Sequence, residues 1–240
     1  MEKLVYLVWA RPSIDRVALR VEALGEVVPA LLAVGVQRLE VHLDDDAADV
    51  AGPMPAPGTE LPIRMAFSFW LGAYDRRDPA EAAIAPLGER CSGYLVTESL
   101  WGEYGDNGRR GPRDWAAGER SPGITTFSVL RRNPTLDPRT FRELWHGHQS
   151  PMSEAVQPRV RYVRNTVVHP LTPGAPPYDG IVHESWPSAD LLGDLHAFHN
   201  GADDRALGEE NMRVMLDSVS QVFDLPQLRS EALSEYQFWE

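Results

Sequence analysis

The chain has 240 residues, which is enough for one large domain or for two small domains of about 100 to 120 residues each. Its net charge of −12 argues against nucleic-acid and anionic membrane partners, because both require a basic surface. Cys91 is the single cysteine, so an intramolecular disulfide and a cysteine zinc cage are excluded, and a reducing compartment is indicated. Since no apolar run reaches the roughly 18 residues of a membrane span, we expect a cytoplasmic protein.

Residues 1–101 show the order strand, helix, strand, strand, helix, strand. Apolar, β-branched and aromatic runs predict strands at 3–9, 36–43, 63–71 and 91–101. Helical spacing predicts an interrupted helix at 13–32 and a short helix at 77–90. An acidic, proline-rich loop is expected at 44–62. This order is that of a ferredoxin-like unit, in which helices cover one face of an antiparallel sheet.

The same order begins again after residues 102–122, a stretch with five glycines and two prolines that is expected to be a linker. Strands are predicted at 124–132, 160–169, 178–186 and 233–240, with helices from Pro138, at 188–199 and at 204–222. Two copies of one unit explain this repetition most simply. Residues 1–101 would form a diverged, mainly structural unit, and residues 123–240 the unit that carries a pocket.

The helix of the second unit has a clear N-terminal signal, and its apolar face also carries a histidine. Asp137 suits the N-cap and Pro138 the first turn. Helical spacing places five side chains on one face: Phe141, Leu144, Trp145, His148 and Met152. His148 is therefore the candidate general acid or base, because an imidazole titrates near neutral pH; the alternative is a histidine that caps the helix end.

The remaining residues of this helix follow from the same spacing and from proline chemistry. His146 lies off the apolar face and is expected to face solvent. Pro151 and Pro158 are expected to end the helix or to limit its continuation.

The strand after this helix offers polar side chains on both faces. Asn165 and His169 share one face, and Tyr162 lies on the other. Asn165 or Tyr162 would polarise a substrate oxygen, whereas core packing of Tyr162 and a loop contact of His169 are the structural alternatives.

Two neighbouring residues of the strand at 178–186 carry further candidate groups. His183 and Glu184 point to opposite faces of that strand, so one of them enters a barrel interior, and Trp186 shares the face of Glu184. The pattern leaves open which of the two points inward.

Four segments of the second unit, in this order, resemble the EthD family of the dimeric α+β barrel superfamily. They are Phe141 with Trp145, "SPM" at 150–152, "QPRVRYVRN" at 157–165 and "YDGIVHESW" at 178–186. The resemblance implies an α+β fold in which two tandem ferredoxin-like units pack as one barrel within a single chain. It also implies a cavity for a small hydrophobic molecule. Gln149 stands where family members commonly carry a histidine, and His183 stands at a position often acidic.

We therefore expect a cofactor-independent enzyme that acts on a small hydrophobic carbonyl or polyketide-like compound by proton transfer, as a dehydratase, cyclase or isomerase. The pocket would be formed by two groups of residues, the acid–base set His148, Asn165 and Tyr162, and the binding set Trp145, Phe141, Met152, Gln149, His183, Glu184, Trp186 and His169. The alternatives are a haem-binding barrel with His169, His148 or His183 as axial ligand, and a non-catalytic ligand-binding protein.

Two further expectations concern metal binding and the oligomeric state. His196 and His199 have a spacing that a metal could use, but no accompanying carboxylate motif, so a structural role is favoured and no metal is expected. The protein would be a monomeric pseudo-dimer or a homodimer.

Overall fold

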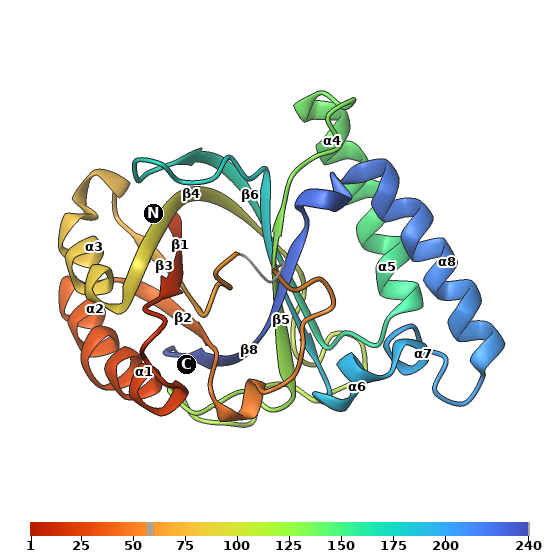
Figure 1. Ribbon diagram of the computed structural model, residues 1–240, viewed down its shortest axis with the longest axis horizontal. Helices are drawn as coiled ribbons and strands as arrows, with labels where there is room; N and C mark the ends of the chain where they lie inside the picture. Colours follow the sequence, from red (N-terminus) through yellow and green to blue (C-terminus); the bar gives the residue numbers. More distant parts are fainter. Residues whose placement is uncertain (57–59, 240) are drawn as a thin grey trace.

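The computed structural model describes residues 1–56 and 60–239 (Figure 1). Its strands are β1 (Glu2–Ala10), β2 (Gln37–Leu43), β3 (Met65–Leu71), β4 (Gly88–Gly102), β5 (Ile124–Leu130), β6 (Arg161–Pro170), β7 (Gly180–Trp186) and β8 (Arg229–Gln237). Parts of the expected loop at 44–62 and of the expected strand at 233–240 lie outside the described residues, namely 57–59 and 240. The expected α+β class is confirmed.

The helices lie between the strands, and the longer ones fall close to the expected ranges, whereas the expected helix at 188–199 is two short helices and a 3₁₀ turn lies in the expected loop at 44–62. In the first half they are α1 (Arg16–Glu22), η1 (Ala23–Val27), α2 (Val28–Val34), η2 (Asp46–Ala48), η3 (Tyr74–Arg76), α3 (Asp78–Ile84) and η4 (Ala85–Leu87). In the second half they are α4 (Pro138–Leu144), η5 (Trp145–Gln149), α5 (Ser150–Val156), α6 (Asp190–Gly193), α7 (Leu195–Phe198), α8 (Arg205–Val222) and η6 (Leu225–Gln227). The turns η1 and η5 are π-helical, and the other η elements are 3₁₀ turns.

The strands form one closed antiparallel barrel in the order β1-β3-β2-β8-β5-β7-β6-β4. Two seams join the halves, β2 with β8 and β4 with β6. Helices α1 to α3 cover the strands of the first half, and α4, α5 and α8 cover those of the second half on the opposite side (Figure 1). Each half therefore has an outer face under its helices and an inner face in the barrel.

Alternation along the strands decides which side chains enter the barrel. The inward apolar side chains include Val5, Leu7, Phe127, Val129, Ile181 and Leu233, which pack into one cluster. The inner face also carries buried charged and polar side chains, among them Lys3, Glu40, His42, Arg161, Asn165, His183 and Glu235. Outward side chains pack instead against the helices, as Leu4, Tyr6 and Val8 do against α1 and α2.

The segment between β4 and β5 packs closely against the barrel. The hydroxyl of Tyr104, which is buried, donates to Glu235 Oε2 over 2.8 Å, and the Glu103 carboxylate accepts from Arg161 Nε over 2.8 Å. The backbone amide of Ser121 donates to the Glu235 carbonyl. This segment thus supplies two side chains to the polar network of the barrel.

The long helices of the two halves share an unusual turn. Asp15 and Asp137 are the N-caps of α1 and α4, and both accept backbone N–H bonds, as expected for Asp137. Residues 23–27 and 145–149 then widen into π turns, where the amide of Val28 reaches the Ala23 carbonyl and that of Ser150 the Trp145 carbonyl. In both halves the residue after the turn is followed by a proline at the start of the next helix.

The widened turn explains why Pro151 does not end the helix. A proline inside an α-helix removes one N–H bond and presses its ring against the carbonyl four residues earlier. The π turn inserts one residue into the helical register, so that the helix continues as α5 through Val156. The expectation that Pro151 ends or limits the helix is therefore wrong.

The same insertion changes which side chains face the sheet. One extra residue rotates the following helix by about 100°, so an α-helical wheel drawn from Phe141 fails after Trp145. Gln149 is buried at 6% exposure, whereas His148 is exposed. The expectation that His148 shares the buried face is wrong for this reason. His146 is half-buried, so the expectation that it faces solvent also needs correction.

None of the helices in the described part of the chain has the length and apolar character that a membrane crossing needs.

Replacement of Gly180 by alanine should destabilise the protein. A Cβ at Gly180 would lie 2.6 Å from Cη2 of Trp145, whose side chain is fully buried, so the indole or the strand must move. Overpacking of this kind costs about 1–3 kcal/mol. Chemical denaturation of Gly180→Ala measures the loss. Gly147→Ala is the matched control in the neighbouring turn, because its Cβ meets open space; equal midpoints for both variants would contradict the packing described.

His146 should make the protein less stable at acidic pH. Burial, followed by the charges of Arg164 and Arg142, lowers the pKa of His146 to about 4. An unfolded histidine titrates near about 6.5, so the unfolded state binds this proton first, and stability falls as the pH drops from about 6.5 towards 4. His146→Gln removes this contribution. The melting temperature of the variant should fall less than that of the wild type between pH 7 and pH 5, and NMR titration of the ring measures the pKa directly.

Candidate functional site

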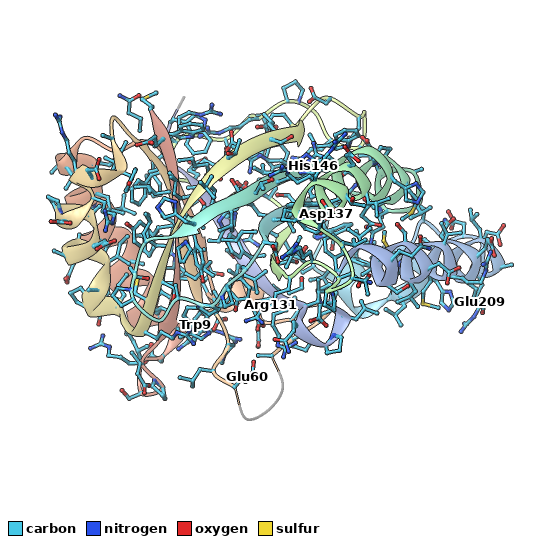
Figure 2. The ribbon with its side chains drawn as sticks, turned by 90° about the horizontal axis from the view of Figure 1, so that it is seen from above. Trp9, Glu60, Arg131, Asp137, His146 and Glu209 are labelled. Carbon is cyan, nitrogen blue, oxygen red and sulfur yellow. The ribbon has the colours of Figure 1, made fainter. Side chains whose placement is uncertain are left out.

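A cavity of about 390 Å³ lies between the outer face of the second-half strands and the helices α5, α7 and α8. This volume falls within the range of small-molecule sites in proteins. Its strand wall is formed by Thr126, Ser128 and Leu130 of β5, Tyr162 of β6, and Val182 and Glu184 of β7. In Figure 2, which views the molecule from above, Asp137 and His146 mark the helix of α4 and η5 on this side of the barrel.

The cavity is mainly apolar on its helix side. Met215, Val219 and Phe223 line it from α8 and the residue after that helix. Leu195 and Leu216 also line it although each is more than half exposed, so they lie at the mouth, where a ligand would enter. An apolar lining with a few polar groups is typical of sites for hydrophobic small molecules.

His199 is the group in this cavity best placed to remove a proton. Its Nδ1 lies 2.8 Å from the carbonyl oxygen of Leu195. A carbonyl can only accept, so Nδ1 carries the proton and Nε2 has the free lone pair. Burial lowers the pKa of His199, which keeps the ring neutral near pH 7. The ring is held in place because Asp194 caps the short helix α7 and Asn211 donates to the His199 carbonyl over 2.8 Å.

Arg159 provides a positive charge in the lining of the same cavity. Its Nη1 donates to Glu184 Oε1, and its guanidinium carbon lies 4.1 Å above the centre of the Tyr162 ring. Arg159 is 3% exposed, and its Nε–H has no hydrogen-bond partner among the described residues. A buried, unpartnered donor beside a cavity is suited to a ligand oxygen.

Tyr162 supplies a second donor. Its hydroxyl oxygen accepts a bond of 3.2 Å from Nε1 of Trp145, so its own proton remains free to donate. Burial, together with the nearby Glu184 carboxylate, raises the pKa of Tyr162, and the phenol therefore stays protonated. Trp145 thus acts beneath the cavity wall by positioning Tyr162.

Gln149 occupies the cavity position at which the EthD resemblance places a histidine. It lines the cavity, and its Oε1 accepts from Ser218 while Nε2 contacts the sulfur of Met215 over 3.4 Å. Both ends of the amide are therefore held by α8. A side chain held in this way can orient a ligand, but it cannot act as a base at neutral pH.

The structure gathers some of the expected site residues and separates others. Tyr162, Gln149 and Glu184 line the cavity. Trp145, Phe141 and Trp186 are buried and pack behind or beside it; the Trp186 indole donates to Thr126 and contacts Phe198. Met152 is partly buried and is absent from the residues that line the cavity.

The other four expected residues lie elsewhere. His148 and His169 are exposed, and His169 contacts the edge of Tyr74. Asn165 and His183 point into the barrel, on the opposite side of the sheet from the cavity. Because side chains alternate along a strand, Asn165 and Tyr162 lie on opposite faces of β6, and His183 and Glu184 lie on opposite faces of β7. Neither pair can therefore line one pocket together.

Two functional residues were missed by the sequence patterns. Arg159 stands just before β6 and has no periodic signal, and the only sequence signal of His199 is its three-residue spacing from His196, which suggests a metal pair. One signal for His199 was available: Asp194 is an N-cap residue, and a short helix begun there places the ring at its end, close to the Leu195 carbonyl.

Comparison with known proteins identifies the fold. No family model and no curated protein matches the chain. Among solved structures, an anthrone oxidase-like protein has a TM-score of 0.55 at 12% identity, covering 100% of this chain and 93% of its own. A candidate monooxygenase from Fusobacterium nucleatum subsp. nucleatum has a TM-score of 0.52 at 9% identity, covering 99% of this chain and 92% of its own.

A candidate monooxygenase from Lactobacillus acidophilus has a TM-score of 0.50 at 10% identity, covering 98% of this chain and 93% of its own. Identities this low show the fold alone. The likenesses nevertheless extend over nearly the whole of both chains. The chain therefore shares the fold of these proteins, which here is an α+β fold built on a closed antiparallel barrel.

Proposed function

We propose that this protein is an enzyme that binds a small hydrophobic carbonyl compound in the second-half cavity and removes a proton from a carbon that the carbonyl group activates, either directly beside it or through a conjugated ring. One observation carries this proposal: His199 lines an apolar cavity as a neutral imidazole whose Nε2 is free to accept a proton. The EthD-like motifs and the expected pair of ferredoxin-like units agree with a cavity of this kind. We further propose that one chain suffices, because the barrel closes within it.

The polar groups of the cavity match the charge that such a reaction develops. When Nε2 of His199 takes the proton, negative charge moves to the carbonyl oxygen of the substrate. The free Nε–H of Arg159 and the hydroxyl of Tyr162 can donate to that oxygen. Glu184 accepts from Nη1 of Arg159 and the Ser150 carbonyl accepts from Nη2, and these two contacts fix the orientation of the guanidinium. Return of the proton to another carbon would complete an isomerisation. In a dehydration the bond to a neighbouring hydroxyl group would break and that group would take the proton as water leaves; in a cyclisation the carbanion would form a bond to a second carbonyl carbon, and the proton would go to that carbonyl oxygen.

Oxidation of the same class of substrate is a second candidate. It is favoured by the neighbours whose names describe them as anthrone oxidase-like and as candidate monooxygenases. A carbanion conjugated with an aromatic carbonyl can be oxidised by O₂, so this route begins with the same proton removal by His199. The two candidates differ only in what happens to the carbanion.

Anthrone is a suitable probe because its acidic C–H group lies opposite its carbonyl across the central ring. We expect the enzyme to accelerate exchange of this hydrogen in D₂O under anaerobic conditions, measured by NMR. His199→Gln should reduce the enzymatic rate by about 10²–10⁴-fold, as is usual for a lost general base. Tyr162→Phe should reduce it by up to about 10²-fold. His148→Gln is the control and should leave the rate unchanged, because that side chain is exposed outside the cavity.

The pH profile should carry the signature of a lowered pKa. Since burial lowers the pKa of His199, the exchange rate should stay constant as the pH falls below about 6.5 and decline only at more acidic pH. His199→Gln should lack this decline.

Repetition of the assay in air separates the two candidates, because only the oxidative route converts anthrone to anthraquinone and consumes O₂. An absorption spectrum of the purified protein tests for haem in parallel through its Soret band. Wild-type exchange no faster than buffer, for anthrone and for a panel of aryl ketones and 1,3-diketones, would overturn the proposal. So would undiminished exchange by His199→Gln.

A further inference from the structure

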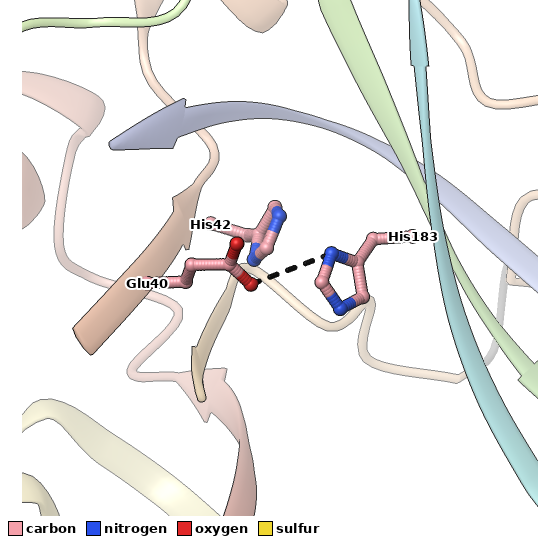
Figure 3. Close-up of side chains that lie close together, drawn as sticks. All are labelled: Glu40, His42 and His183. Atoms are coloured by element: carbon pink, nitrogen blue, oxygen red, sulfur yellow. Dashed lines mark ion pairs between the residues drawn. The ribbon is translucent and has the colours of Figure 1, made fainter. Parts of the chain in front are cut away.

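The inner face of the barrel holds a second group of chemically active side chains, away from the cavity. Glu40 and His42 reach it from β2 of the first half, and His183 reaches it from β7 of the second half (Figure 3). All three are buried, with exposures of 3%, 0% and 1%. One potential ligand atom from each lies within 4.8 Å of the others. None of these residues has a role in the proposed reaction.

The two buried imidazole rings lack hydrogen bonds within the described part of the chain. Neither ring nitrogen of His42 and neither ring nitrogen of His183 has a hydrogen-bond partner among the residues that the structure describes. The rings contact each other edge to face, with centroids 4.7 Å apart, and Phe127 packs against both. Buried imidazole nitrogens almost always have a partner, so a ligand from outside the described residues is expected to bind at least one nitrogen of each ring.

Glu40 presents one oxygen towards this gap. Its Oε1 accepts from Arg161 Nη2 over 2.6 Å, with Gln237 Nε2 at 3.4 Å. Its Oε2 lies 3.6 Å from His183 Nδ1, which is too long for a hydrogen bond (Figure 3). Two atoms bound to the same metal ion at about 2.1 Å lie about 3 to 4 Å apart, so a separation of 3.6 Å suits a shared ion.

The local charge also favours a cation. Arg161 is the guanidinium shared by three carboxylates, those of Glu40, Glu103 and Glu235. The guanidinium and its three carboxylates together carry two uncompensated negative charges, and the ion pair of Lys3 with Glu98 beside them adds none. A divalent ion restores neutrality in the interior.

We propose that Glu40, His42 and His183 bind one divalent transition-metal ion that ties the two halves of the barrel together. Two imidazoles and one carboxylate suit the borderline ions Zn²⁺, Fe²⁺, Co²⁺ and Ni²⁺ better than Mg²⁺ or Ca²⁺, which prefer oxygen ligands. The site is structural, because the sheet separates it from the cavity. His183 and Glu184 are neighbours that point to opposite faces of β7.

The strand pairing predicts one ion per chain. Glu40 pairs with Ser68 across β2 and β3, and Val163 pairs with His183 across β6 and β7. In the opposite half, Val163 therefore takes the place of Glu40, and Ser68 takes the place of His183. Asn165 takes the place of His42. This second set offers no imidazole and no carboxylate, so the internal repeat does not produce a second site.

Metal analysis of tag-free protein tests the proposal. The full chain would be produced in medium supplemented in turn with Zn²⁺, Fe²⁺, Co²⁺ or Ni²⁺, and also refolded with each ion, since the site is closed to solvent. Mass spectrometry of the elements should find close to one ion per chain. The Co²⁺ form should show visible d–d absorption, and X-ray absorption should show nitrogen and oxygen ligands without sulfur.

Two ligand variants and two controls make the assignment specific. His183→Gln and Glu40→Gln should each lower the metal content at least tenfold, whereas His148→Gln and His169→Gln should retain it because both side chains are exposed. Chelation should lower the melting temperature of the wild type and leave that of His183→Gln unchanged. If a ligand variant does not fold, the Co²⁺ and X-ray absorption spectra of the wild type still decide.

Wild-type protein that retains less than a tenth of an ion per chain under every loading condition would overturn the proposal. So would a metal content that persists in both ligand variants. Metal content is measured without any substrate, so its outcome is independent of the anthrone assay.

Discussion

The buried guanidinium of Arg161 is the interaction on which the closed barrel depends. It donates to Glu40 of β2, Glu235 of β8 and Glu103 of the connecting segment, over 2.6 to 2.8 Å. Burial disfavours its charge, but the three carboxylates outweigh that effect and raise its pKa. Removing one partner from a buried pair typically costs about 3–5 kcal/mol, so these four segments are constrained to meet. The barrel seam of β2 and β8 lies directly at this network.

That closure divides the second half into two chemically different sides. Outward side chains of β5 to β7 meet helices that stand far enough away to leave a cavity, with Arg159, Tyr162 and His199 on its walls. Inward side chains meet the first half and form an enclosed interior in which His183 contacts Phe127. The sheet thus separates an accessible site from an enclosed one. Alternate residues along each strand face the one site or the other.

Local patterns predicted the strands and the Asp137 cap because these depend on residues near in sequence. The strand faces were also predictable, but which face was inward for His183 was not, because both faces are buried here and alternation alone cannot orient such a strand. The position of His148 was misjudged because one inserted residue in η5 changes the helical period without a composition signal. Arg159 and His199 converge only in three dimensions, from segments 40 residues apart.

The π turn shared by the two halves bears on how the chain evolved. In both halves it occupies the same place in the helix, with Gly25 and Gly147 inside it and Pro29 and Pro151 two residues after it. Asp137, Gly147 and Pro151 each follow their first-half counterparts by the same 122 residues. Two independent insertions would have had to occur at the same turn of the helix, whereas one insertion before a gene duplication would account for both π turns. Such a duplication would make the ancestor a single unit that already carried the widened turn and closed the barrel by pairing with a second copy of itself.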